Sequence, residues 1–166
     1  MKIVSLRCFY QCLQLKMTKR KIGLPAAVAA ILLSAACNNV SDREMRVRED
    51  IGMFANRYFN YNFPEALTLC TPESAKWIRL AASNVTEADL DVLRAQERGA
   101  EAEVVSVDFG SGDTTAVATV RVSGFMLADT IGAPGHIVAG AEYRIQAVRR
   151  DGRWLVRMAC PLRSGR

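Results

Sequence analysis

The spacing of apolar residues changes near Gly99, and this change leaves few architectures open to the chain. Before Gly99 apolar residues recur at helical spacing, as on one face of an amphipathic helix. After Gly99 they alternate with polar residues, as in strands with one buried face. The 166 residues leave room for one ordinary domain. Helices followed by antiparallel strands indicate an α+β fold, in which N-terminal helices pack on one face of a curved sheet.

The helical part is predicted to contain segments at 42–60, 63–70, 71–82 and from Thr86 to Gly99. The apolar face of the first helix is made by Val47, Ile51, Phe54, Tyr58 and Phe59. Thr71-Pro72-Glu73 is a helix-start signal, because a hydroxyl cap precedes a proline and a carboxylate. Thr86 and Asp89 have the spacing of a capping box, which predicts where the last helix begins.

The strand part is predicted to be a meander of antiparallel strands. Their inward faces should carry Val105, Val107 and Phe109, then Ala116, Ala118, Val120 and Val122, then Tyr143, Ile145 and Ala147, and finally Trp154, Val156, Met158 and Cys160. Gly110-Ser111-Gly112-Asp113 and Asp151-Gly152 predict tight turns, and residues 132–135 predict another reversal. Gly124 predicts a bend within the long second strand.

The net charge of +5 belongs to the N-terminal segment rather than to the domain. Six of the 22 basic residues precede Cys37 and no acidic residue does, so the rest of the chain has 16 basic and 17 acidic residues. A protein that binds nucleic acid needs an excess of cations to displace the counterions of the phosphates. The charge balance therefore argues against a nucleic-acid partner.

Residues 17–36 have the layout of a secretory signal. Lys19, Arg20 and Lys21 precede an uncharged, mostly apolar stretch that ends in the small residues Ser34-Ala35-Ala36. The apolar stretch is shorter than the roughly 20 residues that span a bilayer, so a permanent transmembrane helix is the weaker alternative.

The segment Leu33-Ser34-Ala35-Ala36-Cys37 resembles the lipobox of bacterial lipoproteins, with Ser34 where most lipoboxes have leucine. The resemblance implies that Cys37 receives a diacylglyceryl group and becomes the mature N-terminus, which would anchor the protein to a membrane of the cell envelope. An ordinary cleaved signal with an incidental cysteine is the alternative. Residues 37–42 would then be a polar tether, and residues 1–16 an extension upstream of a natural start at Met17.

Three features over residues 43–163 resemble the nuclear transport factor 2-like superfamily. They are an opening helix with Tyr58 and Phe59 near its end, the segment Phe63-Pro64-Glu65-Ala66-Leu67, and the closing segment Val148–Val156 with its Asp-Gly turn and Trp154. The resemblance implies a cone of helices and sheet that encloses a pocket. The superfamily includes isomerases and dehydratases as well as binding modules without catalysis, so the fold does not choose between these classes.

Cys70 and Cys160 are the cysteines that follow Cys37. In an oxidising compartment such a pair is a candidate disulfide, which would join the helices to the sheet. Two buried thiols are the equally weighted alternative, because one sequence does not give the distance between them.

Few residues have the chemistry of a catalytic site. His136 lies at a predicted hairpin tip, where a solvated polar residue is the ordinary interpretation. Asp108, Asp129 and Glu142 are carboxylates of the kind that isomerases use, but surface charges are the simpler reading. With one histidine and no cluster of ligands at metal-binding spacing, the sequence predicts neither a metal nor another cofactor.

Arg121 and Arg144 lie on adjacent predicted strands. Together they would suit an anionic ligand, although pairing with carboxylates across the strands is the favoured interpretation.

We therefore expect a lipid-anchored domain that binds a small apolar ligand or a protein partner and carries out no catalysis. The candidate pocket lining is Tyr58, Trp77, Phe109, Tyr143 and Trp154. An isomerase-like or dehydratase-like enzyme that uses a pocket carboxylate is the alternative, and it requires such a group with a raised pKa. A third possibility is a purely structural homodimer through the open face of the sheet.

Overall fold

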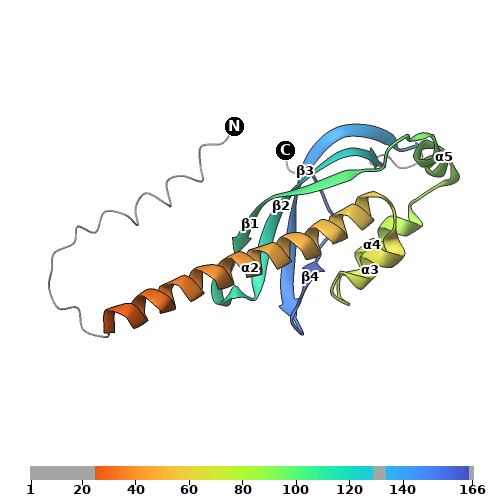
Figure 1. Ribbon diagram of the computed structural model, residues 1–166. Helices are drawn as coiled ribbons and strands as arrows, with labels where there is room; N and C mark the ends of the chain where they lie inside the picture. Colours follow the sequence, from red (N-terminus) through yellow and green to blue (C-terminus); the bar gives the residue numbers. More distant parts are fainter. Residues whose placement is uncertain (1–24, 129–133, 165–166) are drawn as a thin grey trace. The chain divides into compact units, whose positions relative to one another are not determined.

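Four strands form one antiparallel sheet in the order β1-β2-β3-β4. The computed structural model describes residues 25–128 and 134–164. The elements in chain order are α2 (Pro25–Phe59), α3 (Phe63–Thr68), α4 (Ala75–Ser83), α5 (Glu87–Ala95), β1 (Glu101–Phe109), the short 3-10 helix η1 (Ser111–Asp113), β2 (Thr115–Leu127), β3 (His136–Arg150) and β4 (Arg153–Arg157) (Figure 1). The predicted α+β class is thus confirmed.

One face of the sheet is buried against the helices. Along β2 the buried residues are Ala116, Ala118, Val120 and Val122, and their partners on β3 include Ala147, Ile145 and Tyr143, as the alternation predicts. The second half of α2 runs across this face (Figure 1) and buries Val47, Ile51, Phe54, Ala55 and Phe59. The side chains of this central core are contributed by residues 47–158.

The chain divides after Asn38 into two units, and Asn39–Arg166 is the unit that contains the core. A chain that begins at Asn38 therefore retains every core residue. The predicted extension 1–16 and the start of the predicted signal lie outside the described residues.

The long helix α2 begins earlier than the sequence analysis predicts. It starts at Pro25 rather than near Asp42, so Cys37 and the segment expected to be an irregular tether are helical. The physical reason is local: proline suits the first turn of a helix, and the alanine- and leucine-rich residues that follow have high helix propensity without a breaker.

A β-bulge in β1 corrects the predicted inward face at Val105, while Val107 and Phe109 pack against the core as predicted. The register with β2 shifts between Val104 and Ser106, so Val104 faces the core while Val105 is 39% exposed. A bulge leaves backbone groups without partners in the ladder. Here the guanidinium group of Arg48 donates hydrogen bonds to the carbonyls of Val104 (2.6 Å) and Val105 (3.4 Å).

The predicted helix-start signal at Thr71 does not begin a helix. Helix α4 begins at Ala75, and the hydroxyls of Thr71 and Ser74 are 2.8 Å apart in a buried turn before it. The backbone amide of Thr71 donates to the carbonyl of Val156, and the amide of Met158 donates to the Ser74 hydroxyl. Pairing with the end of the sheet therefore holds residues 71–74 out of the helix.

Two local predictions are confirmed in detail. Asp151 (φ 50°) and Gly152 (φ 80°) both have positive φ, as a two-residue hairpin turn requires. Thr86 and Asp89 form the predicted capping box of α5, which ends at Ala95 rather than near Gly99.

Candidate functional site

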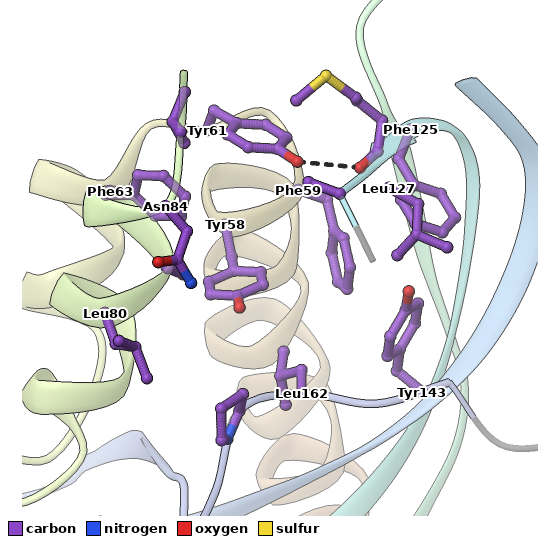
Figure 2. A pocket seen from close by; sticks show the side chains of 15 residues that line it. Tyr58, Phe59, Tyr61, Phe63, Leu80, Asn84, Phe125, Leu127, Tyr143 and Leu162 are labelled. Atoms are coloured by element: carbon purple, nitrogen blue, oxygen red, sulfur yellow. Dashed lines mark hydrogen bonds between the residues drawn. The ribbon is translucent and has the colours of Figure 1, made fainter. Parts of the chain in front are cut away.

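An aromatic cavity of about 200 Å³ lies between the end of α2, helix α4, the end of β2, the middle of β3, and the C-terminal segment (Figure 2). We call it the tyrosine cavity. Its lining is Tyr58, Phe59, Tyr61, Phe63, Leu80, Ala81, Asn84, Val85, Phe125, Met126, Leu127, Ala128, Tyr143, Pro161 and Leu162. None of these side chains carries a formal charge.

Contacts between aromatic rings hold the walls of the tyrosine cavity together. The Phe59 ring lies 4.6 Å from Tyr143 and 5.4 Å from Phe125, measured between ring centroids. The Tyr58 ring packs edge-on against Phe63 at 5.7 Å. Tilted and edge-on pairs of this kind are favourable beyond the area that they bury. They connect α2, α3 and the sheet into one rigid wall.

Two tyrosine hydroxyls point into the cavity, those of Tyr58 and Tyr143 (Figure 2). Neither makes a hydrogen bond to another described residue. Burial raises the pKa of Tyr58, and burial followed by the nearby Tyr58 raises the pKa of Tyr143 to about 12. Both groups are therefore neutral phenols at physiological pH, able to donate or accept a hydrogen bond from a ligand.

Tyr61 forms the top of the cavity in an uncommon backbone conformation. Its φ is 61°, and the amide of the next residue, Asn62, donates to the carbonyl of Arg57, which is the arrangement that usually places glycine after a helix. The hydroxyl of Tyr61 donates to the carbonyl of Met126 at 3.1 Å (Figure 2). Burial first, and then the negative charge of Asp89, raise its pKa to about 12.

The raised pKa values lead to a prediction for the folded domain. Tyr58, Tyr61 and Tyr143 are the tyrosines that follow Cys37. The phenolate absorbance of Tyr61 and Tyr143 should develop close to pH 12, and that of Tyr58 above the ordinary value of about 10. Because the unfolded chain loses these protons first, the domain should lose stability as the pH rises from about 10 to 12. Ultraviolet titration with a denatured control measures this, and a two-tyrosine step near pH 10 in the folded protein would contradict it.

Only two of the five predicted lining residues belong to the tyrosine cavity. Tyr58 and Tyr143 line it, whereas Trp77, Phe109 and Trp154 do not. The rings of Phe109 and Trp154 pack against each other at 5.9 Å, beside Arg43 at the beginning of the domain. Trp77 is half-buried on α4, with its Nε1 hidden and without an acceptor among the described residues.

The residues that the prediction missed had weak signals in the sequence. Phe125 follows the break in alternation at Gly124, which has a φ of 59° and turns the strand so that Phe125 and Met126 are both buried. Pro161 and Leu162 follow the last strand, where nothing in the sequence indicates that the chain returns to the helices.

Among the described residues, the candidate acids and bases lie away from the cavity or serve the fold. Asp89 is buried, and its carboxylate accepts hydrogen bonds from the amide of Gly135 (2.7 Å) and from the amide and hydroxyl of Thr86 (both 2.8 Å). These donors, with Gly135 the largest contributor, lower the pKa of Asp89. A carboxylate held in its ionised form is a structural anchor here, and not the raised-pKa group that an acid–base catalyst needs.

The other candidates that the structure describes are on the surface. Asp108 and His136 are exposed. Glu142 forms an ion pair of 3.0 Å with Arg121, which also lies 3.6 Å from Glu103, so the predicted pairing of Arg121 across the strands is confirmed. Asp129 lies outside the described residues.

The cysteines do not form the disulfide that the sequence left open. Cys70 and Cys160 are free thiols. Cys70 is buried and its thiol donates to the carbonyl of Leu67 at 3.5 Å, while burial raises its pKa. Cys160 was expected on the inward face of the last strand, but β4 ends at Arg157 and Cys160 is exposed beyond it.

The described residues contain no group of three or more potential metal ligands. No helix among them is both long and apolar enough to cross a membrane. No family model matches the chain, and neither a curated protein nor a solved structure matches it. The functional argument therefore depends on the chain's own residues.

Proposed function

We propose that the chain is a bacterial envelope lipoprotein, acylated at Cys37, whose domain binds a small apolar ligand without catalysis. The observation that carries the binding function is the tyrosine cavity, a space of about 200 Å³ whose described lining residues are uncharged and include two hydroxyls without partners among the described residues. Binding sites for small molecules are commonly apolar pockets with a few well-placed polar groups.

The size of the cavity limits the ligand. A dry apolar cavity of about 150 Å³ accepts a molecule as small as benzene. With about 200 Å³, the tyrosine cavity suits a ligand of about one ring. The described lining residues carry no charge, which favours a neutral ligand, since a buried ion would find no counter-charge among them. The phenols of Tyr58 and Tyr143 would hold one polar group of that ligand.

The membrane anchor is proposed from the sequence, on the charged start, the apolar stretch and the cysteine that ends it. The location in the cell envelope follows from that anchor. We further propose that the α+β fold is of the nuclear transport factor 2-like kind, which the order of helices before bent strands supports. The homodimer through the open sheet face stays a prediction.

The alternative functions receive less support. An isomerase-like or dehydratase-like enzyme needs a carboxylate or imidazole in the cavity, and none of the described lining residues has one. A protein partner in place of a small ligand would need a broad apolar face, whereas the aromatic rings here line a space of about 200 Å³, the size of a small molecule.

The binding function is tested with phenol as the probe and the domain that begins at Asn38. We expect saturable changes in the amide NMR signals of the cavity residues, with a Kd in the millimolar range or tighter, as a ligand of one ring allows. Ala81 lines the cavity from α4, so Ala81→Phe should fill it and remove binding.

The matched control is Ala82→Phe, because Ala82 is the next residue of the same helix and is exposed. It should leave phenol binding unchanged. Equal binding by the Ala81→Phe and Ala82→Phe variants, or no saturable binding by the original domain, would contradict the proposed site.

A further inference from the structure

A second cleft, of about 290 Å³, lies at the beginning of the domain. We call it the arginine cleft. Its lining is Asp42, Arg43, Arg46, Arg149, Gly152 and Trp154. Arg46 and Tyr58 are twelve residues apart on α2, which corresponds to about 18 Å along the helix, so the arginine cleft is separate from the tyrosine cavity. The two sites also differ in charge, since three of the six residues that line the arginine cleft are arginines, whereas the lining residues of the tyrosine cavity are uncharged.

Arg43 is the fixed wall of the arginine cleft. Its guanidinium group forms an ion pair with Asp113 and lies 4.2 Å from the centroid of the Phe109 ring. An arginine held by a carboxylate and an aromatic face keeps one orientation. The Nε of Arg43 is buried without an acceptor among the described residues, so Asp113 does not satisfy all of its donors.

Arg46 and Arg149 bring unpaired charge to the cleft. Both are exposed, and neither forms an ion pair with another described residue, in contrast to Arg43, Arg48, Arg57, Arg94, Arg121 and Arg150. The backbone amide of Arg149 donates to the carbonyl of Thr114 at 2.8 Å. This hydrogen bond holds the backbone of Arg149 in place beside the Asp151-Gly152 turn. Asp42 is the one acidic residue in the lining, so the lining carries a net positive charge.

We propose that the arginine cleft binds a phosphate group. Two guanidinium groups from different elements, one on α2 and one on β3, suit the oxygens of a phosphate, which accept paired N–H donors. The space beside Gly152 is open, because a Cβ built there would meet no atom within 4 Å. Trp154 supplies an apolar wall for the group that carries the phosphate.

The position in the chain points to a lipid headgroup as one source of the phosphate. Asp42 follows Cys37 by five residues, which span at most about 18 Å. If Cys37 is acylated as proposed, the cleft lies within reach of the headgroups. Only this source depends on the proposed anchor; the phosphate site itself does not depend on either the anchor or the tyrosine cavity.

The first test is a titration of the domain that begins at Asn38 with inorganic phosphate, followed by the amide NMR signals of residues 42–46 and 149–154. We expect saturable binding that weakens as salt is added. The double variant Arg46→Gln, Arg149→Gln should raise the apparent Kd roughly tenfold or more, because charge-assisted hydrogen bonds are lost.

The matched control is the double variant Arg79→Gln, Arg98→Gln, which removes the same charge from two exposed arginines outside the cleft. It should change the Kd by no more than about threefold, because removing exposed charges outside the cleft has only a small general effect on phosphate binding. Equal losses in the two double variants, or no saturable binding of phosphate, would overturn the proposal.

The second test distinguishes the sources with vesicles of phosphatidylcholine, with and without phosphatidylglycerol. We expect the domain to sediment with the phosphatidylglycerol vesicles. If the cleft variant loses this sedimentation and the control variant retains it, the phosphate comes from a lipid headgroup. Binding of inorganic phosphate without such sedimentation supports a free phosphate ester instead. Vesicle binding that falls equally in both variants contradicts a role for the cleft at the membrane.

Discussion

Replacing Phe54 by alanine should lower the free energy of unfolding of the domain by about 3–5 kcal/mol. Phe54 is fully buried at the centre of the helix–sheet interface, and its ring stacks on Tyr58 with the centroids 5.7 Å apart. Removing the ring leaves a cavity that the β-sheet on one side and α2 on the other are too rigid to fill. Since single domains are stable by about 5–15 kcal/mol, this loss is a large part of the total.

The measurement is urea unfolding followed by circular dichroism, with Met53→Ala as the control. Met53 precedes Phe54 on the same helix but is 44% exposed, so its truncation should change the stability by about 0.5 kcal/mol or less. A loss below about 1 kcal/mol for Phe54→Ala would mean that α2 does not pack on the sheet as described.

Replacing Cys37 by serine should reduce the incorporation of a tagged palmitate to background in bacterial cells that express the full chain. A serine hydroxyl does not form the thioether to the diacylglyceryl group that the lipobox resemblance implies. The exposed Cys160 provides the control, because a Cys160→Ser variant should be labelled like the original chain. Equal labelling of the Cys37→Ser variant would show that the acyl group is attached elsewhere.

The features that sequence patterns predicted correctly are those that short-range chemistry determines. Asp151-Gly152 forms its hairpin because both residues accept positive φ, and Thr86 with Asp89 caps α5 through bonds between residues three apart. Alternation along β2 and β3 likewise identified the buried face, because the period of a strand is local.

The features that were predicted incorrectly depend on contacts between distant segments. The bulge at Val105 is stabilised by Arg48, which lies 57 residues earlier in the chain. The sequence predicts Thr71 as a helix cap, but its backbone amide pairs instead with the carbonyl of Val156 at the end of β4. Neither partner is visible from the local sequence.

The cavity was predicted only in part for the same reason. Alternation correctly placed Tyr143 inward, but inward residues at different positions along a curved strand reach different ends of the domain. Phe109 and Trp154 share the inner face with Tyr143, yet they pack beside Arg43 rather than in the tyrosine cavity. The alternation along a strand shows which face of the sheet a residue occupies. It does not show how far along the domain that residue lies from the tyrosine cavity.

The most direct test of the lipoprotein hypothesis is the mass of the N-terminal peptide of the protein, purified from the membranes of a bacterial host. The hypothesis predicts a mature chain that begins at Cys37 and carries a diacylglyceryl group on its sulfur. A peptide that continues unbroken from Ala36 into Cys37, or a Cys37 with a free thiol, would contradict it.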